Sequence, residues 1–251
     1  MPLPFVTVTF AKDFHVDILR TLLADAYNIY PLYVDLEDVG HAGVARSRVY
    51  VVVVTKMYRV LANPQDIYEK VARELRLRFF TRPWDYLTAS SLEVQCEALE
   101  AARLGKKLYQ PDQSDLTYLL SAREREVVEK LSRKYEEMFG TPAESDRDLV
   151  FFLGDSAEWC TWSATSRKIP TFRRNAGSAK YWFPCEKRLT ALTFPVRSPV
   201  GQAAGLPVLQ AMDVKRASQL AGNAMALQVA GLVQMVALSC FSPVAEVPGP
   251  A

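Results

Sequence analysis

The chain has 251 residues and a mass of 28.2 kDa, which suits one large domain or two small ones. Lys and Arg outnumber Asp and Glu by only 30 to 28, a net charge of +2. This balance excludes a global basic field, so any contact with nucleic acid must come from a local patch. The four cysteines are far apart and form no CxxC pair, so we predict no metal site and no disulfide framework.

The first part of the chain, residues 1–62, has the pattern of a small sheet with one helix. Residues 5–9 alternate and are rich in β-branched side chains, which favours a strand, and residues 16–23 carry leucine and valine at helical spacing. Residues 27–36 read as extended. The β-branched run over residues 49–55 predicts a buried strand that pairs with the preceding one as an antiparallel hairpin. We expect this hairpin at the edge of an incomplete sheet, with Val49 to Val54 close to the open edge.

A charged helical block follows over residues 63–148. Pro64 opens one helix, residues 89–104 form a second, and residues 116–138 form a third that ends at Gly140. Charged residues separate the apolar ones throughout this block, which is typical of helices with a solvated face.

Residues 149–211 are rich in aromatic, Thr, Ser and Arg residues, and residues 212–251 begin with a long helical pattern. That pattern carries no charge between Arg216 and Phe241, so a membrane span is one alternative. Its Gln and Asn residues and its Ala and Gly content favour a buried core helix instead, and we expect this helix to pack back against the sheet of residues 1–62.

Three stretches resemble motifs of the DNA (cytosine-5) methyltransferases, in the order that this family uses. The first is a loop and strand over residues 38–52, similar to the family's Gln-x-Arg-x-Arg signature, with Val44 in place of the glutamine. Its two arginines match as Arg46 and Arg48. In the family the second arginine contacts the flipped cytosine, where a guanidinium can bind the base carbonyl and offset developing charge. The alternative for two arginines before a strand is a surface ion pair.

The second stretch, residues 169–195, resembles the family segment that follows and supports the target recognition region. It ends in Phe-Pro as the family pattern does, but it lacks the acidic residue expected after the second threonine. The resemblance implies DNA contacts for Thr171, Arg173 and Arg174. Ordinary turn and core packing is the alternative for this piece.

The third stretch, Leu220 to Met225, is similar to the family's final Gly-Asn motif, which lines the S-adenosylmethionine site. The resemblance implies a cofactor-binding role for Gly222, Asn223 and Ala224. Glycine permits close approach of the backbone to a ligand, and asparagine supplies both a donor and an acceptor.

The chain lacks three elements that catalysis in this family needs. No Gly-x-Gly occurs, so the cofactor loop is missing. The family's acidic triplet, Glu-Asn-Val, aligns with Thr9-Phe10-Ala11, where no carboxylate remains. The only Pro-Cys dipeptide, Pro184-Cys185, comes too late in the chain to be the nucleophile, and we interpret it as a coincidence.

The resemblance therefore implies an α/β fold with a partial Rossmann-like methyltransferase sheet, a helical insertion and a target-recognition-like region. It implies S-adenosylmethionine as cofactor, at a site incomplete in this chain, with DNA and a missing amino-terminal half or complementary subunit as partners. The start of the chain lacks a signal peptide's basic flank, so we expect an intracellular protein, nuclear if eukaryotic. The alternatives are a non-catalytic DNA- or partner-binding module and, less in keeping with its composition, a membrane-anchored protein.

Overall fold

The computed structural model describes residues 5–10, 14–86, 90–113, 115–170, 203 and 225–244. The chain divides into two compact units. The first contains residues 1–41, 46–80 and 226–251, and the second contains residues 42–45 and 81–225. The units divide after Phe80, whereas the sequence suggested a boundary after residue 62.

The first unit is built on a three-stranded antiparallel sheet of β1 (Phe5–Phe10), β2 (Tyr27–Val34) and β3 (Arg48–Thr55). The strand order is β1-β3-β2, and β3 pairs antiparallel with both neighbours, Val8 opposite Val51 and Leu32 opposite Tyr50. The predicted hairpin of β2 and β3 is therefore confirmed. We also expected Val49 to Val54 to lie close to an open edge, and that prediction is wrong because β3 is the central strand.

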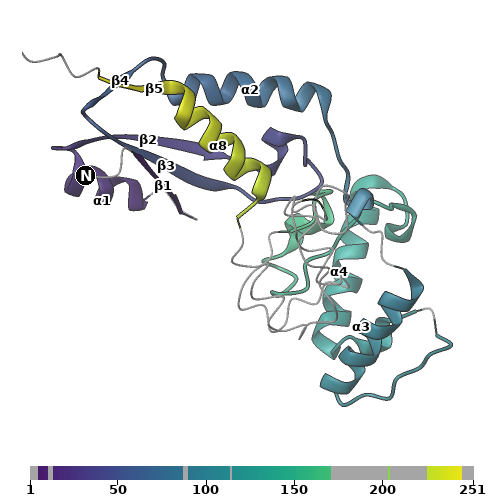
Figure 1. Cartoon of the computed structure of the whole chain (residues 1–251). Coiled ribbons are helices and arrows are strands. Elements are labelled where there is room, and N and C mark those ends of the chain that lie inside the picture. The colour runs from purple at the N-terminus through teal and green to yellow at the C-terminus, as the bar shows by residue number, and fades with distance from the viewer. Residues whose placement is uncertain are drawn as a thin grey trace, which may run out of the picture. The chain divides into compact units, whose positions relative to one another are not determined.

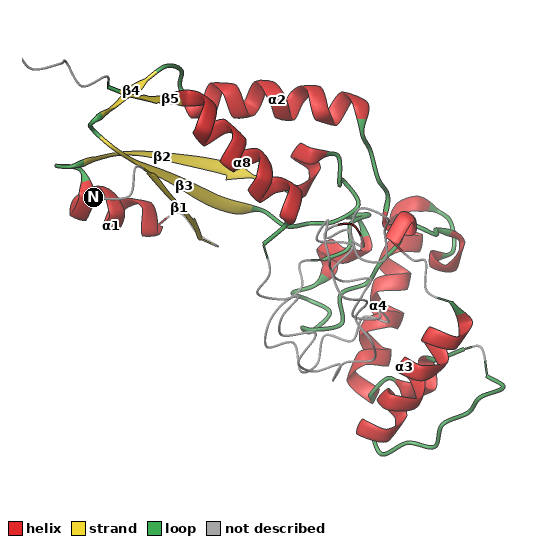
Figure 2. Ribbon diagram, viewed as in Figure 1, coloured by secondary structure: helices red, strands yellow, loops and turns green. Residues whose placement is uncertain are grey.

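Helices cover both faces of this sheet, as Figures 1 and 2 show. Helix α1 (Phe14–Leu23) connects β1 to β2 and packs Val16 and Leu19 against Val49, Val51 and Val53. Side chains alternate along a strand, so Tyr50, Val52 and Val54 point to the opposite face. On that side α2 (Pro64–Arg78) and α8 (Leu227–Cys240) contact each other. The result is a three-layer α/β/α unit, which confirms the α/β class at a coarse level.

The carboxyl end of the described chain is tied to the first unit by a short strand pair. β4 (Tyr58–Val60) pairs antiparallel with β5 (Phe241–Pro243), and the Leu61 N–H donates to the Cys240 carbonyl over 2.8 Å. The Phe241 ring lies 5.4 Å from that of Tyr30 between centroids. The last helix thus returns to the sheet as predicted, although residues 212–224 of the expected helix lie outside the described residues.

The described part of the second unit has helices and connecting loops. It contains α3 (Ser91–Leu104) and α4 (Ala122–Phe139), with short 3₁₀ helices at Pro83–Tyr86, Thr117–Leu119, Ala143–Ser145 and Thr161–Ala164. Helix α4 starts later than the expected Leu116, because Ser121 caps it reciprocally with Glu124. It ends at Phe139 with Gly140 as its cap, which confirms the predicted stop, and the φ of 67° at Gly140 is the left-handed conformation that favours glycine.

A backbone-to-backbone approach explains the glycine of the loop before β3. The loop residue Val44 bridges to Ile169, and a Cβ on Gly43 would lie 2.5 Å from the Arg82 carbonyl carbon. No larger residue fits there without moving the backbone.

Candidate functional site

Several polar residues of the first unit lie where β1 and β2 end and β3 begins. β1 and β2 are each antiparallel to β3, so they run parallel to each other and their carboxyl ends meet at the same edge. The 3₁₀ helix η1 (Leu36–Val39) follows β2 at this edge, and β3 begins there. In open α/β sheets, ligands bind outside the carboxyl ends of the parallel strands. We call this region the carboxyl edge.

Arg46 and Arg48, the two arginines singled out in the sequence, both lie at the carboxyl edge. Arg46 is only 5% exposed, and Arg48 is half-buried. Burial and then the neighbouring Arg48 lower the pKa of Arg46 to about 10, while Tyr50 opposes the shift. Burial lowers the pKa of Arg48 as well, against the effects of Tyr50 and Asp35. Two guanidiniums that repel each other at a partly dehydrated site are well suited to bind a carbonyl or an anion.

A capped 3₁₀ turn sits beside these arginines. The Asp35 carboxylate accepts from the Glu37 N–H and from the Ser47 hydroxyl, so it links the end of β2 to the residue before Arg48. Gly40 closes the turn with φ 85°, and a Cβ there would lie 2.4 Å from that of Phe79. Asp35 therefore fixes the backbone on which Arg48 is carried.

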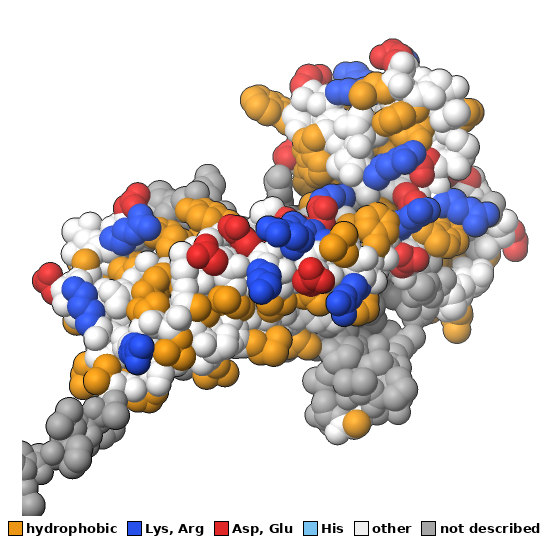
Figure 3. Space-filling model, turned by 90° about the horizontal axis from the view of Figure 1, so that it is seen from above, with side chains coloured by type: hydrophobic (Ala, Val, Ile, Leu, Met, Phe, Trp, Pro, Cys, Tyr) orange, Lys and Arg blue, Asp and Glu red, His pale blue; other side chains and the backbone are white. Residues whose placement is uncertain are grey.

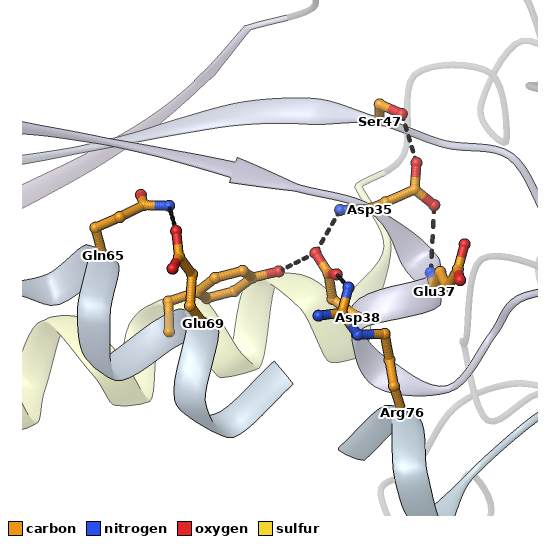
Figure 4. Close-up of polar contacts among 8 residues, drawn as sticks. Asp35, Glu37, Asp38, Ser47, Gln65, Glu69 and Arg76 are labelled. Atoms are coloured by element: carbon orange, nitrogen blue, oxygen red, sulfur yellow. Dashed lines mark hydrogen bonds and ion pairs between the residues drawn. The ribbon is translucent and has the colours of Figure 1, made fainter. Parts of the chain in front are cut away.

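A buried carboxylate, Asp38, anchors the same turn to α2, as Figure 4 shows. Its Oδ2 accepts from the Asp35 N–H at 2.8 Å and from the Tyr68 hydroxyl at 2.7 Å, and its Oδ1 accepts from Arg76 Nη1 at 3.0 Å. Burial, followed by the Asp38 charge and hydrogen bond, raises the pKa of Tyr68 well above its ordinary value. Three donors satisfy this carboxylate, so we assign it a structural role in positioning the carboxyl edge.

A shallow hollow of about 380 Å³ opens at the carboxyl edge, with Tyr33, Asp35, Ser47 and Arg48 in its lining. A second hollow of about 460 Å³ lies on the α2 side of Asp38. Tyr33 is exposed beside both, and it offers an aromatic face next to a guanidinium and a carboxylate. Such a combination can hold a planar polar group by stacking and hydrogen bonds.

The first turn of α8 also reaches this region. His41, directly after the η1 turn, forms a 2.8 Å hydrogen bond with Gln228 of α8. Burial lowers the pKa of His41, and the bond to Gln228 opposes this. The amino-terminal end of α8 is therefore held against the carboxyl edge, where the described part of this segment begins at Met225.

The surface of α2 has no dominant sign of charge. Figure 3, which looks down on this helix, shows Lys and Arg interspersed with Asp and Glu there. The pairs Arg78–Glu74 and Arg76–Asp38 contribute to this mixture. Among the residues of the first unit that the structure describes, this face presents no broad basic surface for a nucleic acid backbone.

The structure brings two of the predicted site residues together and leaves the others undescribed. Arg46 and Arg48 share the carboxyl edge. The implied DNA contacts (Thr171, Arg173, Arg174), the implied cofactor residues (Gly222, Asn223, Ala224) and Pro184-Cys185 lie outside the described residues. The sequence analysis missed Asp35, Asp38 and Tyr68. The spacing Asp35-x-x-Asp38 is a capping pattern that could have revealed the turn.

No family model matches this chain, and no curated protein matches it. Among the residues that the structure describes, no helix is long and apolar enough to cross a bilayer. Within the same residues, no group of three or more His, Cys, Asp and Glu side chains could hold a metal ion.

Proposed function

We propose that this chain is the carboxy-terminal portion of a DNA (cytosine-5) methyltransferase-like protein, and that it is inactive alone. One observation carries the proposal: Arg46 and Arg48, which match the family's paired arginines, lie together at the carboxyl edge of an α/β sheet, Arg46 buried and Arg48 half-buried. Ligands of such sheets bind at that edge.

The sheet topology supports a Rossmann-like origin. β1 and β2 are parallel strands joined by α1, with the antiparallel β3 between them. Doubly wound sheets are built from parallel strands joined by helices, and many of them carry an antiparallel strand near one edge. We therefore propose that the three strands are one end of a larger methyltransferase sheet.

The proposed chemistry assigns a different role to each arginine. Arg48 is half-buried beside the hollow, so its guanidinium would bind the carbonyl of a flipped cytosine and offset the negative charge that arises when a thiolate adds to the ring. Arg46 is the more deeply buried, and it would support Arg48 and raise the local positive potential. S-adenosylmethionine would supply the methyl group in the complete protein.

The lack of a carboxylate in the sequence Thr9-Phe10-Ala11 supports inactivity. Thr9 lies directly opposite Tyr50, at the position that resembles the family's acidic triplet. A threonine hydroxyl cannot protonate or neutralise a ring nitrogen as a carboxylic acid does. Even with a thiolate supplied in trans, an acid would have to come from the other polypeptide.

The test is transfer of labelled methyl groups from S-adenosylmethionine to a cytosine-rich duplex. We expect none with the chain alone, and transfer once a methyltransferase amino-terminal half with a glycine loop, a Pro-Cys and its own acid is added. In that mixture Arg48→Ala should lower the rate by roughly 10²–10³-fold. The matched control is Arg59→Ala, which removes an exposed arginine on β4 and should change little.

Two outcomes would overturn the proposal. Label transfer by the chain alone, surviving Cys185→Ser, would mean that a complete active site has been overlooked. An Arg48→Ala effect no larger than that of Arg59→Ala would remove the observation on which the proposal stands.

A non-catalytic DNA-binding module is the second candidate, because the paired arginines are present while the acid is absent. In that case the chain alone would bind duplex DNA with an affinity that falls as salt is raised. Removing one phosphate-contacting arginine would reduce the slope of that salt dependence by about one. DNA binding that needs no added half, with no methyl transfer in any mixture, would favour this module.

A further inference from the structure

The two edges of the sheet in the first unit differ in how they are protected. β2 forms one edge and carries Pro31 in its middle, which removes a backbone donor and discourages a further strand. β1 forms the other edge, and its sequence Phe-Val-Thr-Val-Thr-Phe has no charge, proline or glycine. Such a strand is a ready template for pairing with another chain.

The side chain of Thr7 on β1 also lacks a hydrogen-bond partner on the β3 side. Thr7 lies opposite Val52 of β3, which has no polar side-chain atom to offer it. Its hydroxyl oxygen is buried and has no hydrogen-bond partner among the described residues. A strand on the open side of β1 would supply the partner that β3 cannot.

The β1 sequence is complementary to itself in one antiparallel register. A two-fold axis through Val8 places Thr7 of one copy opposite Thr9 of the other, on the same face of the joined sheet, and repeats that pair by symmetry. Directly opposed threonines can hydrogen-bond through their hydroxyls. We propose that β1 is a dimerisation edge, at which two copies of this chain pair β1 with β1 to form one continuous six-stranded sheet.

Helix α1 adds apolar surface to the same interface. It packs on the face of the sheet that contains Val8, and it leaves Ile18 and Leu22, one turn apart, 48% and 72% exposed. A two-fold axis perpendicular to the sheet keeps both copies of α1 on one face, near the axis. Burying these side chains would add to the stability of the paired backbones. The inference does not rest on the proposed function.

The proposal is tested by measuring the mass of the unmodified chain in solution and of variants that carry charged residues on β1. Equilibrium sedimentation over a wide dilution range should give a reversible dimer of twice 28.2 kDa for the unmodified chain. The double change Thr7→Lys with Thr9→Lys puts like charges opposite each other twice, and should weaken dimerisation roughly tenfold or more. The same should hold for Thr7→Glu with Thr9→Glu.

Mixing the two double variants should restore a one-to-one dimer, because Lys then faces Glu at both pairs. This restoration separates a lost interface from a failed fold, since unfolded chains would not recover on mixing. Asn28→Lys, on the edge that carries Pro31, is the matched control and should leave the dimer unchanged. A monomer at every concentration, or a dimer that the Lys variant leaves intact, would overturn the proposal.

Discussion

Removing the Asp38 carboxylate should loosen the carboxyl edge and destabilise the first unit alone. In Asp38→Ala the buried Tyr68 hydroxyl loses a charge-assisted hydrogen bond, which contributes about 1.5–3 kcal/mol. The Asp35 N–H loses its cap, at about 1 kcal/mol. The Arg76 side chain is 46% exposed, so its ion pair adds at most about 1 kcal/mol. The expected loss in the free energy of unfolding is therefore about 2.5–5 kcal/mol.

The distribution of tryptophan provides an internal control for this measurement. All four tryptophans lie between residues 81 and 225, so their fluorescence reports the second unit only. Amide hydrogen exchange in β2, η1 and α2 reports the first unit. We expect Asp38→Ala to speed exchange in these elements, while the urea midpoint of tryptophan fluorescence stays in place.

Two further variants divide the effect among its parts. Tyr68→Phe removes the hydroxyl and keeps the ring, so it should cost about 1.5–3 kcal/mol. Asp38→Asn keeps an acceptor without the charge, so its cost in free energy of unfolding should lie between that of Tyr68→Phe and that of Asp38→Ala. The reasoning fails if Asp38→Ala costs less than about 1 kcal/mol, or if Asp38→Asn combined with Tyr68→Phe costs the full sum of the two single changes.

The remaining predictions concern both units. Ser121→Ala removes the cap of α4 and should cost about 1 kcal/mol by thermal melting; no loss would mean that the cap is redundant. Gly43→Ala should cost about 1–3 kcal/mol in the same assay, because its Cβ meets backbone; a neutral result would show that the loop shifts freely. Burial raises the pKa of Asp146, but hydrogen bonds and the Arg167 guanidinium outweigh it and hold the pKa below its ordinary value. This stabilisation is present above the ordinary aspartate range and is lost as the pH falls through the lowered value, so Asp146→Asn should flatten the acid limb of stability, measured by tryptophan fluorescence. Finally, co-expression with the amino-terminal half should raise the yield of soluble chain and compete with self-association at β1; an unchanged yield and dimer fraction in sedimentation would argue for a self-contained domain.

Local signals in the sequence predicted much of the fold. The β-branched run before Thr55 gave a buried strand, Pro64 gave a helix start, and Gly140 gave a helix end, because each depends on residues that are close in the chain. The strand order could not be predicted in this way. β3 pairs with a strand on each side. Its second partner, β1, is separated from it in the chain by α1 and β2, so no local pattern predicts the pairing.

In the candidate site, too, residues close in the chain could be selected from the sequence, whereas contacts between distant segments could not. The resemblance to a family motif selected Arg46 and Arg48, and the structure places both where β3 begins; their role in binding stays a prediction. The network around Asp38 depends on Tyr68 and Arg76, which reach it from a helix that the sequence placed in a separate block. The short pairing of β4 with β5 likewise joins segments far apart in the chain, and no local pattern marks it.

The discontinuity of the first unit imposes an order on how a newly made chain can fold. Its sheet and α2 leave the ribosome first, but α8 and β5 follow only after the whole of the second unit has been made. At roughly 5–20 residues per second, this delay is on the order of ten seconds, far longer than a hairpin needs to form. During that time α2 and η1 lack the helix that later packs against them, and its apolar partner surface is uncovered. The nascent chain therefore passes through a state that chaperones can bind, and a ribosome stalled before residue 226 would release a first unit without its last layer.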